Sequence, residues 1–446
     1  MHEAVTRHLL LPVHERLRGR DTHAVYRRLR RNDRSSPAAL ESLRLAKLRA
    51  LLRHCLERVP LQRERLHAAG VRQPEDVDLS SLAALPPMER SDVREHLAGL
   101  CTDGTTRGLL RYSTGGSTGA PLVFCTDQRK ESCHNAQKLR YRAWYGVRPG
   151  DRQVDFWGSP IELDNQSRLR LFKDRWLLNH RLLSAFDLST ERLDAYAREL
   201  LDYRPRLIYG YPTVIYRMAA HIRDRGLQLG DWRPRLVACT AEMLLEHQRQ
   251  TIAEVFAAPV ANEYGSRDAG LVAHECPEGR LHLAAEHVLV EADRLDDEGV
   301  GDLLITNLDA YGMPLLRYRV GDRARLQGEA CSCTLPLPVL GGLAGRTNDF
   351  LVGRSGKLIH SLAPIYVLRE YATLRQFRLH QAADLSLTVT LVSREPLPAA
   401  ELDSIRARLQ GILDLAVEVR FEFPEAIAPE RSGKYRWVIS EAADAS

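Results

Sequence analysis

The sequence is poor in lysine and contains no long apolar run. Only six of its 63 basic residues are lysine, so a lysine in a special loop is less expected by chance. No apolar run reaches the length of about 18 residues that a membrane-spanning helix needs. The first residues, Met1–Val5, do not begin an apolar signal core. We therefore expect a cytoplasmic protein without a transmembrane segment.

Cysteine is also scarce, with eight residues in a chain of 446. That density excludes a disulfide scaffold and favours reduced thiols, which can bind a metal where they cluster. The composition, 44% hydrophobic and 27% charged, is typical of a globular chain with two or more domains. The formal net charge of +5, averaged over this length, indicates neither nucleic acid nor an acidic membrane as a partner.

The first hundred residues are expected to be helical. Leucines at positions 45, 48, 52 and 56 recur at helical spacing between arginines. The arginine-rich stretch 16–34 is best explained as the solvated face of a helix, and a nucleic-acid-binding arm is the less favoured alternative.

From about residue 110, short apolar runs alternate with helical patterns. We predict strands near 205–209, 235–239 and 301–306, and helices at 192–201, 213–224 and 241–256. This alternation predicts α/β layers with a largely parallel sheet. Beyond 347, the patterns predict strands at 386–392 and 417–423 around a helix at 399–413. The predicted chain thus has a large N-terminal domain, 1–346, with 1–100 as a helical lead-in, and a small α+β C-terminal domain, 347–446.

The most distinctive segment is a loop of glycines and hydroxyl residues. It consists of Ser113, Thr114, Gly115, Gly116, Ser117, Thr118 and Gly119. Glycines let backbone N–H groups point into a concavity, and the hydroxyls add donors, which together suit a polyphosphate. No Gly-Lys-Ser/Thr follows, so this is not a Walker A loop. The strand-like runs on both sides favour a tight loop between strands over a flexible linker.

The loop resembles the phosphate-binding loop of the adenylate-forming superfamily, and the chain is most similar to its phenylacetate–CoA ligase-like branch. Further segments carry the resemblance in the family's order. Residues 237–244, with Glu242, resemble the strand and loop beside the nucleotide. Residues 262–268 resemble the motif in which an aromatic ring and a glycine, here Tyr264 and Gly265, face adenine.

The resemblance also assigns roles to charged residues. The acid that closes the adenine motif helps to hold Mg²⁺ in the family, and here it is Asp268 in place of the usual Glu. The preceding position, normally a hydroxyl near the α-phosphate, is Arg267. Residues 315–322 resemble the motif whose carboxylate, here Asp322, accepts hydrogen bonds from both ribose hydroxyls. Arg346 matches a residue that contacts phosphate or ribose.

The C-terminal domain of the family is mobile. Asn348 falls at the family's hinge, where Asp or Lys is usual, and Lys434 matches the catalytic lysine of the C-terminal motif. Such a lysine bridges the substrate carboxylate and the α-phosphate, where it neutralises developing charge. After the domain rotates, residues 353–360 would approach the acceptor.

The resemblance implies a ligase that activates a carboxylic acid with ATP and Mg²⁺, releases pyrophosphate and transfers the acyl group to CoA. An amine, a carrier-protein thiol or another small nucleophile is an alternative acceptor. A nucleotide-binding relative without catalysis and an acyltransferase using a preformed acyl-CoA are further alternatives. The intact Lys434 argues against the first, and the phosphate loop argues against the second.

The acyl pocket is expected near 156–160, 209–212 and the strand before Tyr264, by family precedent. These segments supply aromatic side chains, namely Phe156, Trp157, Tyr209 and Tyr211. They favour an aromatic acid slightly over aliphatic or amino-acid-derived acids.

Three cysteines and one histidine form a candidate zinc set. Cys276 and His282 follow the adenine motif, and Cys331 and Cys333 follow the ribose motif. Such a set suits tetrahedral Zn²⁺ in a structural role, because four protein ligands leave no open position for chemistry. His274 is an alternative ligand, and free thiols beside an unrelated histidine are the alternative to a metal.

Overall fold

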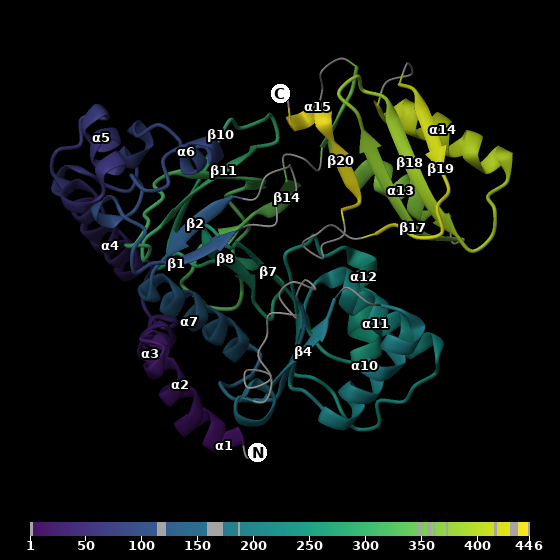
Figure 1. Ribbon diagram of the computed structural model, residues 1–446, viewed down its shortest axis with the longest axis horizontal. Helices are drawn as coiled ribbons and strands as arrows, with labels where there is room; N and C mark the ends of the chain where they lie inside the picture. Colours follow the sequence, from purple (N-terminus) through teal and green to yellow (C-terminus); the bar gives the residue numbers. More distant parts are fainter. Residues whose placement is uncertain are drawn as a thin grey trace.

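The computed structural model describes residues 3–113, 122–157, 173–185, 188–346, 350–354, 358–360, 362–371, 373–413, 417–428 and 436–444 (Figure 1). They form a large N-terminal part with helices packed on sheets, and a smaller α+β domain at the upper right of Figure 1. The predicted α/β fold is confirmed. None of the described helices is long and apolar enough to cross a membrane.

Helices dominate the first hundred residues. They are α1 (Glu3–Val5), the π-helical turn η1 (Thr6–Leu10), α2 (Leu11–Leu17), α3 (Thr22–Asn32), α4 (Pro37–Arg58), α5 (Pro60–Ala68) and α6 (Arg90–Glu95), with short turns η2 (Pro74–Asp76), η3 (Ser81–Ala84) and η4 (Thr102–Gly104). The Ser36 side chain caps α4 by accepting from Ala39 N at 3.2 Å. Leu48 and Leu52 of the predicted stripe are fully buried on this helix.

The main sheet has eight strands in the order β13-β9-β8-β7-β6-β5-β3-β4. Five form its parallel part: β3 (Gln153–Trp157), β4 (His180–Ser184), β5 (Leu207–Gly210), β6 (Leu236–Thr240) and β7 (Val260–Ser266). Three continue it antiparallel: β8 (Gly270–Glu275), β9 (Leu281–Leu283) and β13 (Val339–Leu340). The largely parallel sheet expected from the sequence is therefore present.

Helices cover both faces of this sheet. On one face α10 (Thr190–Tyr203), α11 (Pro212–Asp224) and α12 (Glu246–Phe256) share a core with Ile208 and Val237, while the turn η5 (Lys173–Leu177) precedes β4. Leu207 and Leu236, the strand neighbours of Ile208 and Val237, point to the opposite face, because successive strand residues alternate between the two faces. There they pack with Tyr145, which directly follows α7 (Gln128–Trp144). Helix α12 begins later than the predicted residue 241, because Ala241 has a φ of +68°.

A second sheet, which the sequence patterns did not separate from the first, has the order β10-β11-β12-β14 and is antiparallel. Its strands are β10 (Val288–Asp293), β11 (Val300–Asn307), β12 (Tyr318–Arg325) and β14 (Gly342–Arg346). The hairpin β1 (Leu110–Ser113) and β2 (Val123–Thr126) flanks the glycine-hydroxyl loop, as the strand-like runs predict.

The C-terminal domain is built on a four-stranded sheet, order β19-β18-β17-β20. Its elements are β15 (Phe350–Val352), β16 (Leu358–His360), α13 (Leu362–Arg369), β17 (Leu374–Gln381), β18 (Leu387–Ser393), α14 (Ala399–Leu413), β19 (Val419–Glu422), β20 (Val438–Ser440) and α15 (Glu441–Asp444). Leu379 and Val389 of the sheet share a core with Leu409 of α14. The expected domain boundary after residue 346 falls between β14 and β15.

A buried arginine fastens α7 to the rest of the N-terminal part. Arg140 is fully buried and pairs with Glu286, which follows β9, and with Asp33 at 2.7 Å, which follows α3. Asn32 also donates to Glu286. Because a buried charge without a partner is costly, these groups hold three segments together.

Replacing Arg140 with methionine keeps a long side chain but leaves Glu286 and Asp33 without their main cation. We expect urea denaturation to show a loss of about 3–5 kcal/mol in unfolding free energy. The control Arg72→Met, at an exposed arginine, should change it by less than about 0.5 kcal/mol. Equal effects of the two substitutions would mean that the buried pairs do not hold these segments.

Candidate active site

The adenine and ribose motifs meet where the two sheets approach each other. Tyr264 lies near the carboxyl end of β7, and Asp322 lies on β12 of the second sheet. The Tyr264 hydroxyl donates to Asp322 Oδ2 at 2.9 Å. At the end of β6, Glu242 Oε2 accepts from Thr213 N, in the first turn of α11, at 3.3 Å. Carboxyl ends of parallel strands are where ligands bind in open α/β sheets.

Asp268 is held on the turn between β7 and β8. Its Oδ1 accepts from Ser266 Oγ at 2.6 Å and from Ala269 N at 3.1 Å. Its Oδ2 accepts from Tyr318 Oη at 2.9 Å, and the side chain is buried. The carboxylate is therefore fixed from both sheets. The neighbouring Arg267 is exposed.

Two further residues position this turn, and the motif comparison did not identify them. Lys130 of α7, which is buried, donates to the backbone carbonyl of Asp268. Asn307 Nδ2, at the end of β11, donates to the carbonyl of Ala269 at 2.8 Å. The rarity of lysine was a signal for Lys130, because it is one of only six in the chain. Asn307 carried no comparable signal.

Gly265 is required by the packing of its own turn. A Cβ at this position would lie 2.6 Å from the carbonyl oxygen of Gly270 and 2.9 Å from Leu271 Cα. Both are backbone atoms of the neighbouring strand, which cannot move without displacing the turn that carries Asp268.

Several predicted site residues fall outside what the structure describes. These are Thr114, Gly115, Gly116, Ser117, Thr118, Gly119, Asn348 and Lys434. Ser113 ends β1 and Arg346 ends β14, opposite Asp322 in the ladder, but their side chains are also outside the described set. Their assigned roles stay predictions.

Aromatic rings gather at the ends of β3 and β5. Trp157 stacks on Tyr211 with 4.5 Å between ring centroids and on Tyr209 with 5.8 Å. The Tyr209 hydroxyl donates to Glu263 at 2.8 Å and accepts from Lys138 Nζ at 2.9 Å. Burial by itself would raise the pKa of Glu263, but Lys138 and the smaller contributions of neighbouring groups together outweigh burial, so that carboxyl has a lowered pKa. The expected acyl region thus combines stacked rings with an ion pair between the buried Glu263 and the half-buried Lys138.

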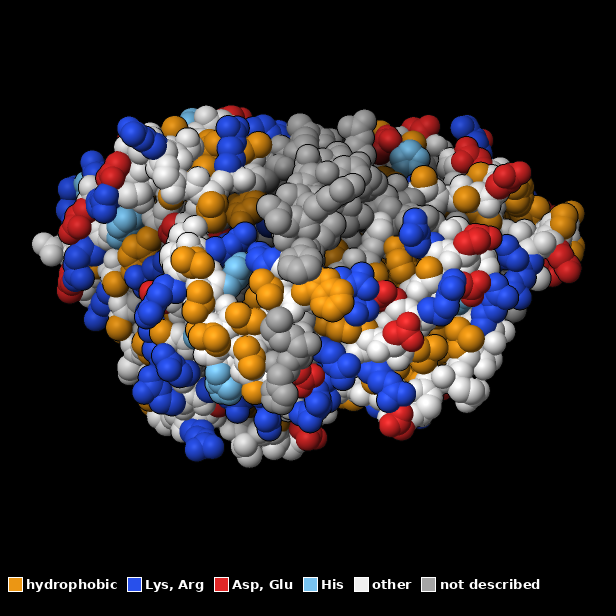
Figure 2. Space-filling model, turned by 60° about the horizontal axis from the view of Figure 1, so that its bottom comes forward, with side chains coloured by type: hydrophobic (Ala, Val, Ile, Leu, Met, Phe, Trp, Pro, Cys, Tyr) orange, Lys and Arg blue, Asp and Glu red, His pale blue; other side chains and the backbone are white. Residues whose placement is uncertain are grey.

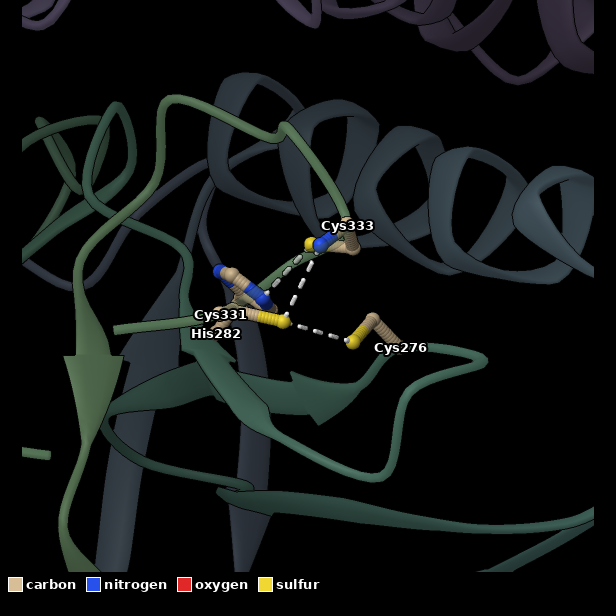
Figure 3. A group of neighbouring side chains, drawn as sticks. All are labelled: Cys276, His282, Cys331 and Cys333. Carbon is tan, nitrogen blue, oxygen red and sulfur yellow. Dashed lines mark hydrogen bonds between the residues drawn. The ribbon is translucent and has the colours of Figure 1, made fainter. Parts of the chain in front are cut away.

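The four predicted metal ligands come together in space (Figure 3). Cys276 Sγ lies 3.6 Å from Cys331 Sγ, and Cys333 Sγ lies 3.2 Å from His282 Nε2. All four ligand atoms lie within 4.8 Å of one another. A zinc ion at about 2.3 Å from sulfur in a tetrahedral set separates its ligand atoms by close to 3.8 Å, which this cluster fits. His274 does not belong to it and is bonded to the Glu275 carbonyl at 2.7 Å.

The orientation of His282 suits metal binding. Its Nδ1 lies 2.9 Å from the Leu337 carbonyl oxygen, which only accepts, so Nδ1 carries the hydrogen. Burial lowers the pKa of His282, which keeps the ring neutral. The Nε2 lone pair then faces the cysteines, in the arrangement usual for metal-binding histidines.

A second buried cluster, Cys133, His287 and Asp309, has metal-ligand residue types but is already filled by a cation. The Lys47 ammonium is 2.5 Å from Asp309, and His287 Nδ1 lies 3.0 Å from the same carboxylate. The lysine supplies the positive charge that a metal would bring, so this cluster is a structural ion-pair network.

No family model matches the chain. Protein CapK of Staphylococcus aureus is 25% identical over 374 residues, which cover 82% of this chain and 81% of CapK. The phenylacetate-coenzyme A ligase of Thermus thermophilus is 28% identical over 326 residues, which cover 71% of this chain and 72% of the ligase. The resemblance to the phenylacetate–CoA ligase-like branch is confirmed.

A solved structure matches this chain over both domains. Crystalline 2-hydroxyisobutyryl-CoA ligase in the postadenylation state, in complex with 2-HIB-AMP, has a TM-score of 0.72 at 19% identity, over 92% of this chain and 91% of that chain. The same ligase with CoA in the thioesterification state has a TM-score of 0.60. The fold is that of adenylate-forming ligases, and its overall arrangement is closer to the first state.

Substituting Tyr318 with phenylalanine removes only the hydroxyl that donates to Asp268 Oδ2. We expect an unfolding free energy lower by about 1–3 kcal/mol, because a buried carboxylate loses a donor. Tyr203→Phe is the matched control, since the buried Tyr203 hydroxyl has no hydrogen-bond partner within the described part of the chain. That control should leave stability unchanged or slightly higher. A Tyr318→Phe protein as stable as wild type would contradict the assigned hydrogen bond.

Proposed function

We propose that this protein is an AMP-forming ligase that activates a small carboxylic acid with ATP and transfers the acyl group to CoA. One observation carries the proposal. The Tyr264–Asp322 pair and the fixed Asp268 lie where the carboxyl end of β7 meets β12 of the second sheet, in the fold of ligases that form acyl adenylates. The curated phenylacetate–CoA ligases among the relatives support the same chemistry.

In the first half-reaction, a carboxylate oxygen of the substrate attacks the α-phosphorus of ATP, and the bond to pyrophosphate breaks. The Tyr264 ring would face adenine, and Asp322 would hold the ribose hydroxyls while Tyr264 orients its carboxylate. Asp268 would hold Mg²⁺ through Oδ2, because that oxygen accepts a hydrogen bond only from Tyr318 and keeps a further lone pair. The bound metal would neutralise charge on the phosphates. Lys434 would neutralise charge at the α-phosphate.

The acceptor then attacks the acyl carbon, and AMP leaves. CoA is the proposed acceptor, since the curated relatives include phenylacetate–CoA ligases, and a small amine is the alternative. For the acid we propose an aromatic ring, supported by the stack of Trp157 with Tyr209 and Tyr211. Aliphatic and amino-acid-derived acids are the alternatives, and the substrate panel below includes them.

Pyrophosphate release with MgATP tests the function against a panel of aryl, fatty and amino acids. We expect a signal that depends on the acid, is trapped by hydroxylamine as a hydroxamate, and rises when CoA is added. If amines but not CoA increase pyrophosphate release, the acceptor is an amine and not CoA. ATP binding by calorimetry with no pyrophosphate release for any acid would favour a nucleotide-binding protein.

Replacing Lys434 with alanine should separate the half-reactions. Acid-dependent pyrophosphate release is expected to fall by about 10²-fold or more, as for loss of a group that stabilises transition-state charge. Transfer from a presynthesised acyl adenylate to CoA should stay close to wild type. The matched control is Lys173→Ala, whose ammonium lies 3.1 Å from His14 Nε2 on the N-terminal helix, and it should retain both activities. Equal loss of both half-reactions in the Lys434 variant would refute this role.

We also propose that Cys276, His282, Cys331 and Cys333 bind one structural Zn²⁺, supported by their mutual distances and the tautomer of His282. The ion would connect the β8–β9 turn to the segment that follows β12. Four protein ligands would complete its coordination, so it would take no part in catalysis.

Double substitution of Cys331 and Cys333 with serine should abolish zinc binding and lower the melting temperature by several degrees. Metal analysis of the purified protein is expected to find one zinc per wild-type chain and none in the variant. Cys55→Ala, which truncates a buried cysteine outside the cluster, should lose stability but keep its zinc. Wild-type protein without zinc, with unchanged melting on substitution, would exclude the site.

A further inference from the structure

The N-terminal helix exposes a stripe of large aliphatic side chains. Val5, Leu9, Val13 and Leu17 are 44%, 57%, 49% and 83% exposed, and they recur every four residues along α1, η1 and α2. The same helix is seated on the protein through the buried Thr6, whose hydroxyl donates to the Leu177 carbonyl at 3.2 Å. Four large aliphatic residues exposed on one helix face are more than the isolated surface hydrophobics of an ordinary monomer.

An exposed aromatic ring lies on the segment beside the stripe. Trp176 is 55% exposed and belongs to η5, which lies against the N-terminal helix through the Thr6 contact and the Lys173–His14 contact. Tryptophan is enriched at membrane–water interfaces, because its ring is apolar while its N–H is polar.

The same arm holds the excess positive charge of the chain. Residues 3–34 contain nine arginines and four acids, a formal charge of +5, which equals the net charge of the whole protein. Arg16, Arg27, Arg28 and Arg31 are exposed, and within the described residues none of them pairs with an acid. Arg27, Arg28 and Arg31 of α3 face outward, since the buried Val25 and Leu29 of this helix pack against α7. The net charge averaged over the whole chain does not reveal that the positive charge is concentrated in this arm.

We propose that this arm, residues 3–34 with Trp176, docks the enzyme on an anionic lipid surface. An interfacial helix buries an apolar stripe at the headgroup boundary while basic side chains beside it contact anionic headgroups. Figure 2 turns this end of the molecule toward the viewer, and hydrophobic and basic side chains lie side by side there. A second copy docked through the same arm would bring a charge of +5 against an equal charge. Nucleic acid would leave the apolar stripe without a role.

Vesicle cosedimentation of the full chain tests the proposal. We expect binding to vesicles of equal parts phosphatidylcholine and phosphatidylglycerol, weakening as salt is raised, and no binding to phosphatidylcholine alone. Leu9→Ser with Leu17→Ser should abolish binding. Arg27→Gln, Arg28→Gln and Arg31→Gln together should weaken it by about 10²-fold, since each arginine near such a surface contributes roughly fivefold.

Matched controls distinguish the arm from general surface properties. Leu295→Ser, at another strongly exposed leucine, and the triple variant of Arg72, Arg94 and Arg107 to Gln should bind as wild type. All variants should keep their acid-dependent pyrophosphate release. No binding to anionic vesicles overturns the proposal. Two other results would also overturn it. One is a dimer in light scattering that the double leucine variant converts to monomers, and the other is DNA binding that the double leucine variant does not change.

Discussion

The hydrogen bond from Tyr264 to Asp322 joins the two sheets of the N-terminal part at the candidate nucleotide site. Each partner belongs to a different sheet, so the bond exists only if both sheets are packed correctly. The sheets share a core, in which Leu271 and Val272 of β8 pack with Leu303 and Ile305 of β11. The core sets the distance between the sheets, and the hydrogen bond sets the direction of one buried carboxylate. The fold and the site thus depend on the same packing.

Three cationic side chains of helix α7 contact other elements of the N-terminal part. Lys130 reaches the turn of Asp268, Lys138 pairs with Glu263 at 3.7 Å, and Arg140 pairs with Glu286. Each partner comes from another element, so the helix is held in one rotation and one register. Buried pairs of this kind add little net stability over apolar packing, and their known value is in specifying geometry. Here that geometry positions the candidate metal-binding carboxylate.

Much of the fold could be predicted from sequence because period and composition act locally. Alternation identified β18 and β19, and the helical pattern identified α11 and α14. Helix α12 began later than predicted because a pattern does not reveal the positive φ of Ala241. The second sheet was missed because its pairings are set by how strands pack after folding.

In the candidate site, too, the sequence indicates individual residues but not the contacts between them. Motif order selected Tyr264, Asp268 and Asp322 as candidates, whose roles stay predictions. The order of the motifs could not show that Tyr264 forms a hydrogen bond with Asp322, because the two residues are 58 positions apart and lie on different sheets. Cys276 and Cys331 are separated by 55 residues, so only the fold shows that their sulfurs are neighbours. Residue type indicates which chemistry to expect, and tertiary packing decides which groups meet.

Gly265 changes how the adenine motif is understood. A glycine beside a nucleotide is readily explained by the space that the base needs. In this protein the backbone of the adjacent strand already excludes a side chain, because Gly270 O lies 2.6 Å from the position of a Cβ. Recurrence of this glycine among relatives would therefore not be evidence that they bind adenine. A relative that lost nucleotide binding would still need it to fold the turn, so Tyr264 and Asp322 are the better diagnostic positions.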